Sequence, residues 1–193
     1  CLDRRECSMY CKSSLIVHFL MSGTMVMSCC STMVTSQRAS ADESLIFQVR
    51  ETEWQAAYRG GNDREKVLEL VRPGESIKTW KDLLSINQIK RDEKNQGATV
   101  QQMADSFQQL LRENMGAVHW QVLESSPTSV TIWWRTAGNA SQPQQHEVMR
   151  YLMGRENIYR IAYTTKSRSF TFHNVREWAE KLQQARVMGV SRP

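Results

Sequence analysis

The stretch VHWQVLESSPTSVTIWWRTAGNASQPQQHEVMRYLMGRENIYRIAYTT, residues 118–165, decides the fold. Four runs within it are rich in β-branched and aromatic residues, and each run is bounded by a turn or a polar loop. This pattern predicts strands at 118–123, 129–136, 145–153 and 157–165. Because the connections are short, strands that are neighbours in sequence are expected to pair as an antiparallel meander.

A second group of strands is expected before the meander. The segments 53–59 and 64–71 flank Gly60-Gly61-Asn62-Asp63, a strong turn signal, so they are predicted to form a hairpin. Residues 76–84 (SIKTWKDLL) place Trp80, Leu83 and Leu84 at helical spacing, which predicts a short helix. A further strand is expected at 85–90.

Two longer helices are predicted from apolar stripes. Residues 100–114 repeat apolar side chains at helical spacing after Thr99, a plausible N-cap. Residues 175–187 do the same, with Thr171 or Asn174 as the cap. A sheet with apolar residues on both faces must be covered on both sides. The prediction is therefore a single α+β domain over residues 44–188, a curved and largely antiparallel sheet covered by helices on both faces.

One stretch resembles a group of poorly characterised proteobacterial lipoproteins. Residues 68–88 read LELVRPGESIKTWKDLLSINQ, and GRENIY at 154–159 turns into a strand in a similar way. The element order is also similar to the PsbP-like α/β/α sandwich. The resemblance covers about residues 44–187 and implies that fold and an envelope location. It transfers no catalytic residues.

The N-terminal segment, residues 1–30, has the layout of an export signal, with Met9 as a candidate start. Lys12 supplies the positive charge and an apolar run follows it. Val26-Met27-Ser28-Cys29 then resembles a bacterial lipobox, which implies a diacylglycerol thioether on Cys29 and, with a non-Asp residue next, sorting to the outer membrane. An uncleaved membrane helix and a plain signal peptide cut elsewhere remain alternatives. Residues 31–43 are expected to be a polar tether, and 189–193 a tail.

Composition excludes several functions for the folded part. All five cysteines fall within residues 1–30, so the body has no disulfide framework, no cysteine-based zinc site and no thiol chemistry. The net charge is +5, but acidic and basic residues are interspersed rather than gathered in a stripe. This distribution does not favour nucleic acid as a partner. We expect neither a cofactor nor a bound metal ion.

Two sets of side chains are candidates for function. His119, His146 and His173 are the only histidines in the body, and their convergence would be needed for a metal site or a hydrolase. None has the spacing of a known catalytic motif, so surface or hydrogen-bonded histidines are the alternative.

Trp133, Arg135 and Tyr151 form the second set, a hypothetical interaction surface. An exposed tryptophan beside an arginine is a common interface anchor. Trp133 shares its strand face with Thr131 and Arg135, because strand side chains alternate. The alternative is that Trp133 lies under a helix.

These observations favour a lipid-anchored, periplasm-facing protein of the bacterial envelope. Because the sequence shows no catalytic motif, we expect the domain to be non-catalytic. The domain is expected to bind another envelope protein or to stabilise an assembly. The alternatives are a periplasmic domain that binds a small ligand or a lipid, and a hydrolase built on the histidines.

Overall fold

The computed structural model describes residues 33–35, 43–93, 95–138 and 143–189. All of them belong to the second of the two units into which the chain divides, Ser31–Pro193. The predicted signal segment with Cys29, most of the tether and most of the tail lie outside the described residues. Within the described part, no helix is long and apolar enough to cross a membrane.

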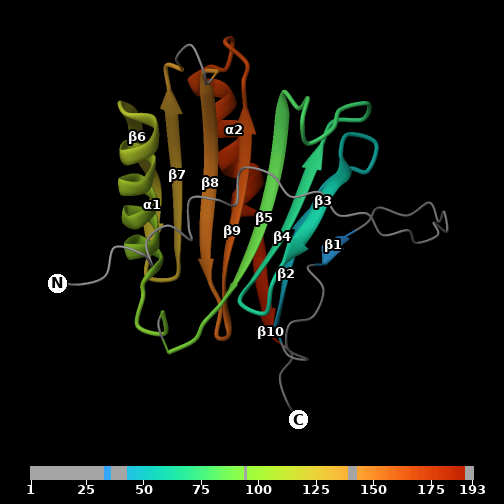
Figure 1. The fold of residues 1–193 in the computed structure, drawn as a ribbon. Coiled ribbons are helices and arrows are strands. Elements are labelled where there is room, and N and C mark those ends of the chain that lie inside the picture. Colours follow the sequence, from blue (N-terminus) through green and yellow to red (C-terminus); the bar gives the residue numbers. More distant parts are fainter. Residues whose placement is uncertain (1–32, 36–42, 94, 139–142, 190–193) are drawn as a thin grey trace. The chain divides into compact units, whose positions relative to one another are not determined.

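A seven-stranded antiparallel sheet dominates the described structure (Figure 1). Its strand order is β3-β4-β5-β9-β8-β7-β6. The predicted hairpin and the predicted four-strand meander are both confirmed as parts of this sheet. The bounds are β3 Gln55–Gly61, β4 Glu65–Val71, β5 Asp82–Lys90, β6 Val118–Ser126, β7 Ser129–Thr136, β8 Gln145–Met153 and β9 Asn157–Thr165.

A second, three-stranded sheet was not predicted. It consists of β1 (Met33–Thr35), β2 (Glu43–Gln48) and β10 (Arg186–Gly189), with β2 in the middle. Strand β2 is short, and its partners come from distant parts of the chain, so no local turn signal marks it. Its buried side chains, Leu45 and Phe47, join the core of the domain.

Two helices are present in the described part. Helix α1 (Val100–Met115) begins with a capping box, in which the Thr99 side chain accepts from the Gln102 backbone N–H at 3.1 Å. Helix α2 (Phe172–Gln183) has Thr171 at its N-cap. It ends earlier than predicted, because the segment after Gln183 turns back to form β10 beside β2.

The two helices pack on opposite faces of the large sheet. Helix α1 covers β6, β7 and β8 on one face, where its buried residues meet Ile132, Trp134 and Met149. On the other face, α2 shares the cover with strand β2 over Val148 and Ile161.

The predicted fold class, a PsbP-like sheet covered by helices on both faces, is wrong, because strands dominate the structure and the second sheet shares the cover of the face that carries α2. Nearly half of the described residues are in strands, and they form two sheets with only two helices. The third expected helix, at 76–84, does not form. Residues 77–79 are a turn, and Leu83 and Leu84 belong to β5, an interior strand of the large sheet.

Candidate functional site

A β-bulge in strand β6 determines which side chains gather at one end of the sheet. Near the turn, Glu124 is opposite Thr131, but beyond the bulge the register shifts by one residue, so that His119 is opposite Arg135. A shift of one residue moves every later side chain to the other face. Trp120 therefore lies beside α1, where it meets Phe107, and His119 lies on the opposite face.

The next strand extends this arrangement into a row. Arg135 on β7 is the cross-strand partner of His119 on β6 and of His146 on β8. Directly opposed residues in antiparallel strands point to the same face. The order His119, Arg135, His146 across three neighbouring strands thus places one permanent cation between two imidazoles.

Trp133 lies beside this row and contacts most of its members. Its ring centroid is 4.8 Å from that of His119 and 6.4 Å from that of His146, which it stacks at an interplanar angle of 8°. The Arg135 guanidinium carbon is 5.8 Å from the Trp133 centroid. Phe172, the first residue of α2, approaches the Trp133 ring edge-on at 5.9 Å. We call His119, Trp133, Arg135, His146 and Phe172 the Trp133 cluster.

Exposure divides the Trp133 cluster into a base and a rim. His146 is 2% exposed, and Trp133 is half-buried against the core shared with α2. His119 and Arg135 are exposed, and Phe172 is 43% exposed although it is a large apolar side chain. The rim therefore presents a cation, an imidazole and an apolar ring around a rigid aromatic base.

The charge state of the base follows from its surroundings. Burial, and then the positive charge of Arg135, lowers the pKa of His146. A His146 Nε2 to Gln144 Nε2 contact of 2.7 Å engages one side of the ring. Because its pKa is lowered, His146 is neutral at neutral pH. Arg135 supplies a permanent positive charge beside it.

Two ring nitrogens of the Trp133 cluster have no partner. Trp133 Nε1 and His146 Nδ1 are both buried and make no hydrogen bond within the described part of the chain. Buried polar atoms are normally paired, and an unpaired one costs free energy. Two of the buried unpaired polar atoms thus lie in the base of the Trp133 cluster.

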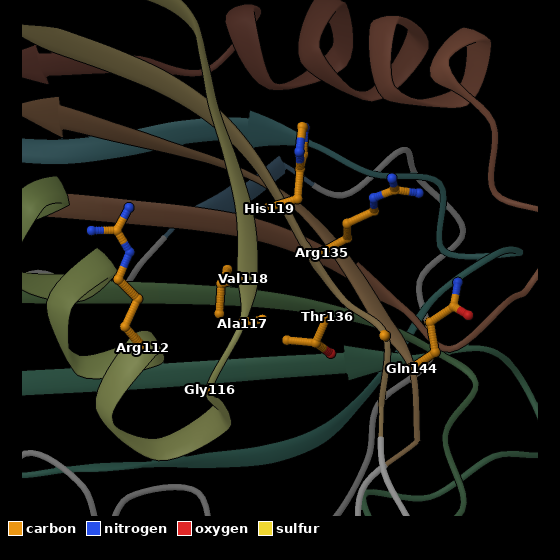
Figure 2. Close-up of a pocket in the computed structure, with 9 residues that line it drawn as sticks. Arg112, Gly116, Ala117, Val118, His119, Arg135, Thr136 and Gln144 are labelled. Atoms are coloured by element: carbon orange, nitrogen blue, oxygen red, sulfur yellow. The ribbon is translucent and has the colours of Figure 1, made fainter.

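A surface cavity of about 720 Å³ adjoins the cluster (Figure 2). Its lining includes His119 and Arg135 of the rim together with Arg112, Thr136 and Gln144. Figure 2 shows His119 and Arg135 on one side of β6 and Arg112, from α1, on the other. None of the lining side chains is acidic. The cavity is thus a hollow at the edge of the sheet with positive groups on both sides of the strand.

The remaining predicted site residues lie elsewhere. His173 is an exposed residue in the first turn of α2. The described residues contain no group of three or more His, Cys, Asp or Glu side chains that could hold a metal ion. Only two of the three histidines, His119 and His146, come together, and a cation lies between them. This geometry suits neither a metal ion nor a pair of acid–base groups.

Tyr151 is separated from Trp133 by the sheet. It is 3% exposed and packs in the core beneath α1, on the same face as Trp134. Burial raises its pKa to about 12, so it stays neutral. Tyr151 therefore does not belong to the hypothetical interaction surface, which keeps Trp133 and Arg135.

The face that holds Tyr151 also carries a buried ion pair. Glu147 accepts from Arg160, from Trp134 Nε1 at 3.1 Å and from Thr164 Oγ1 at 2.7 Å. Every oxygen of this carboxylate is thus engaged by a neighbouring strand. The pair fills the space between α1 and the sheet, and we assign it a structural role.

Sequence reasoning missed Phe172 and Gln144, and it missed the association of the histidines with Trp133. The pairing of Arg135 with His146 could have been found from the hairpin register alone, since β7 and β8 pair without a shift. The pairing with His119 could not, because an unbulged hairpin would have placed Trp120 opposite Arg135.

Comparisons with known proteins leave the family open. No protein-family model and no curated protein matches this chain. A structural neighbour is the crystal structure, at 1.50 Å resolution, of a protein from Bacteroides thetaiotaomicron VPI-5482. It shares 10% sequence identity with a TM-score of 0.42 over 75% of this chain. The match spans 44% of the neighbour, less than half of its length.

Proposed function

We propose that this chain is a lipid-anchored protein of the bacterial envelope whose domain binds another protein through the Trp133 cluster. The observation that carries the binding half is the exposed rim of Arg135 and Phe172 around the half-buried Trp133 ring. Tryptophan and arginine are the residue types most enriched at energetically dominant interface positions. A rigid aromatic base with a polar rim also provides contact area at a small cost in side-chain entropy.

The anchoring half rests on the sequence from Val26 to Cys29 and on the polar residues that follow it. A diacyl anchor at the end of a tether would hold the domain near the membrane without inserting it. The partner would then be another envelope protein within reach of that tether.

A photo-crosslinking residue in place of Phe172 tests the binding half directly. The structure offers a matched control in Tyr58, which is 42% exposed against 43% for Phe172 and lies on β3, the opposite edge of the sheet. In cells that produce the full chain, we expect one protein adduct from position 172 and none from position 58. The same adducts from both positions, or none from 172, would contradict the proposal.

Mass spectrometry of the same membrane-purified protein tests the anchoring half. We expect the mature chain to begin at a diacylated Cys29. An unmodified N-terminus would rule out the lipid anchor and leave the binding half to be judged by the cross-links alone.

The cavity beside the cluster supports a second candidate function, the binding of a small ligand. Its volume of about 720 Å³ is within the range of ligand sites. Native mass spectrometry of the intact chain would show a constant mass increment if such a ligand is retained. An increment without any protein adduct at position 172 would favour this second function over the first.

A further inference from the structure

We propose that the Trp133 cluster recognises an acidic segment of its protein partner, with a partner carboxylate bound by Arg135 and His119. This inference rests on the proposed protein-binding function and adds the chemistry of the partner to it. Its basis is the juxtaposition of an unpaired guanidinium, an exposed imidazole and a tryptophan face at the mouth of a cavity without acidic lining residues.

Arg135 has no carboxylate partner among the described residues, whereas Arg72, directly after β4, and Arg160, on β9, are each bound to a carboxylate. Arg72 pairs with Glu53 and Asp82, and Arg160 pairs with Glu147. An arginine fork suits a carboxylate in a bidentate geometry, and such charge-assisted bonds are the stronger ones. Arg135 is therefore available for an acceptor supplied by another molecule.

The neighbours of Arg135 make an external acceptor favourable. His119 and His146 flank it across the sheet, so its cross-strand neighbours are imidazoles and not carboxylates. On α2, Arg176 adds a second cation, whose guanidinium carbon is 5.1 Å from the Phe172 centroid. Electrostatic complementarity then selects an acidic partner and disfavours a basic one.

The aromatic residues explain why a peptide segment fits better than a free anion. The Trp133 and Phe172 rings are 5.9 Å apart, beside the cation, and they offer an apolar contact to the groups that flank a carboxylate. Apolar contacts around a charged pair exclude water and strengthen it. Inorganic phosphate has no apolar part and would gain nothing from these rings.

The test uses the full 193-residue chain and a defined probe, a blocked and fluorescently labelled hexaglutamate peptide carrying one leucine. Binding is followed by fluorescence anisotropy at physiological ionic strength, where the Debye length is about 8 Å, with the hexalysine analogue as the opposite charge. We expect the acidic peptide to bind and the basic one not to bind. Loss of one charge-assisted contact in Arg135→Gln is expected to weaken binding by about tenfold or more.

Arg59→Gln is the matched control. Arg59 is exposed on β3 at the far edge of the same sheet and, among the described side chains, makes no ion pair or ring contact. Its variant loses the same charge, so we expect hexaglutamate affinity within about twofold of the parent protein, because distant surface charges are screened. Equal weakening in both variants would show a response to net charge only and would overturn the inference.

Two further outcomes are informative. One distinguishes a small anion from an acidic peptide as the ligand, and the other distinguishes failure of this inference from failure of the proposed protein-binding function. If inorganic phosphate displaces the peptide at equal concentration, the site takes a small anion and the acidic-segment inference fails. If the cross-link from position 172 persists at full yield in Arg135→Gln, the partner is bound without this carboxylate pair. That result would overturn the inference while leaving the proposed protein-binding function in place.

Discussion

At the scale of single residues, His146 couples the candidate site to the stability of the domain. The groups that face it are Arg135 and Trp133 from β7, Thr165 from β9, Gln144, and Phe170 from the segment before α2. None of these is a carboxylate that could stabilise an imidazolium. Burial, followed by Arg135, accordingly lowers the pKa of His146 in the folded protein.

This lowered pKa predicts a pH dependence with a definite sign. In the unfolded chain the histidine pKa is about 6.5, so on acidification the unfolded state binds a proton before the folded state does. The stability associated with neutral His146 is present above pH of about 6.5 and is lost as the pH falls toward the lower folded pKa. Below about pH 6.5, which is roughly the pKa of the unfolded histidine, the free energy of urea unfolding should fall less steeply with decreasing pH in His146→Gln than in the parent protein.

His173→Gln is the control for this measurement, because His173 is exposed in the first turn of α2. Its pH profile should follow that of the parent protein. The prediction concerns the slope against pH and is therefore independent of any constant loss of stability in the variant. Identical slopes in His146→Gln and the parent would contradict it.

At the scale of elements, helix α1 depends on its first turn. The Thr99 hydroxyl accepts from Gln102 N at 3.1 Å, and the Gln102 side chain accepts from Thr99 N at 2.9 Å. Together these bonds satisfy two backbone donors, one of them among the N–H groups that a helix start leaves free. Val100 and Ala104, which follow at once, are buried against the sheet.

We expect Thr99→Ala to destabilise the domain by about 0.5–2 kcal/mol, because the cap is lost while the helix must still pack. Ser106→Ala, at an exposed position within the same helix, is the matched removal of a hydroxyl. It should change stability by less than about 0.5 kcal/mol. Urea unfolding of both variants measures the difference. Equal losses in the free energy of unfolding would show that the Thr99 hydroxyl does not stabilise the helix as a cap.

Strand β5 shows why an element can differ from its local pattern. Residues 76–84 have helical spacing, but an isolated helix of this length is marginal in water. In the structure β5 pairs with β9 over its whole length, Asp82–Lys90, and with β4 from Leu83 to Ile89. Pairing on both sides and burial of Leu84 and Ile86 favour the strand.

At the scale of the whole molecule, Glu43 connects the second sheet to the large one. Its carboxylate accepts from the backbone N–H groups of residues 155–157, from Asn157 Nδ2 and from the Tyr159 hydroxyl. These donors belong to the turn between β8 and β9 and to the start of β9, more than a hundred residues later. Successive backbone donors of this kind form an anion-binding nest, which the protein fills with its own side chain.

The close fit of this carboxylate predicts that Gly154 cannot be replaced. A Cβ at position 154 would overlap Glu43 Oε1, whereas a Cβ at Gly97 would meet nothing within 4 Å. We expect Gly154→Ala to destabilise the domain by about 1–3 kcal/mol, as overpacking of a filled site does. Gly97→Ala should change stability by about 0.5 kcal/mol or less.

A double-mutant cycle checks the cause. If the carboxylate is what occupies the space, Gly154→Ala should cost much less in a Glu43→Ala background than in the parent protein, since neighbouring sites are not additive. If the losses in the free energy of urea unfolding were additive, the cost of Gly154→Ala would not come from overlap with the Glu43 carboxylate.

The sequence by itself determined the elements that depend on neighbouring residues. The β3–β4 hairpin follows from its Gly-Asn turn, the β6–β9 meander from alternating runs with short connections, and α1 from its apolar stripe and cap. In each case the interactions that specify the element lie within a few residues of one another, so local chemistry is sufficient. The placement of Trp133 and Arg135 as neighbours on one strand face was predictable for the same reason.

Only the tertiary structure decided the features that depend on distant partners. Strand β5 forms because β4 and β9 pair with it on either side. Strand β2 forms because it pairs with β10 and packs its buried side chains in the core below α2. The Trp133 cluster depends on the one-residue bulge in β6, which turns His119 toward Arg135 and Trp120 toward α1. Strand side chains alternate, so a single inserted residue reverses the faces. The bulged register packs the partly buried Trp120 against Phe107 of α1 and brings His119 to the site.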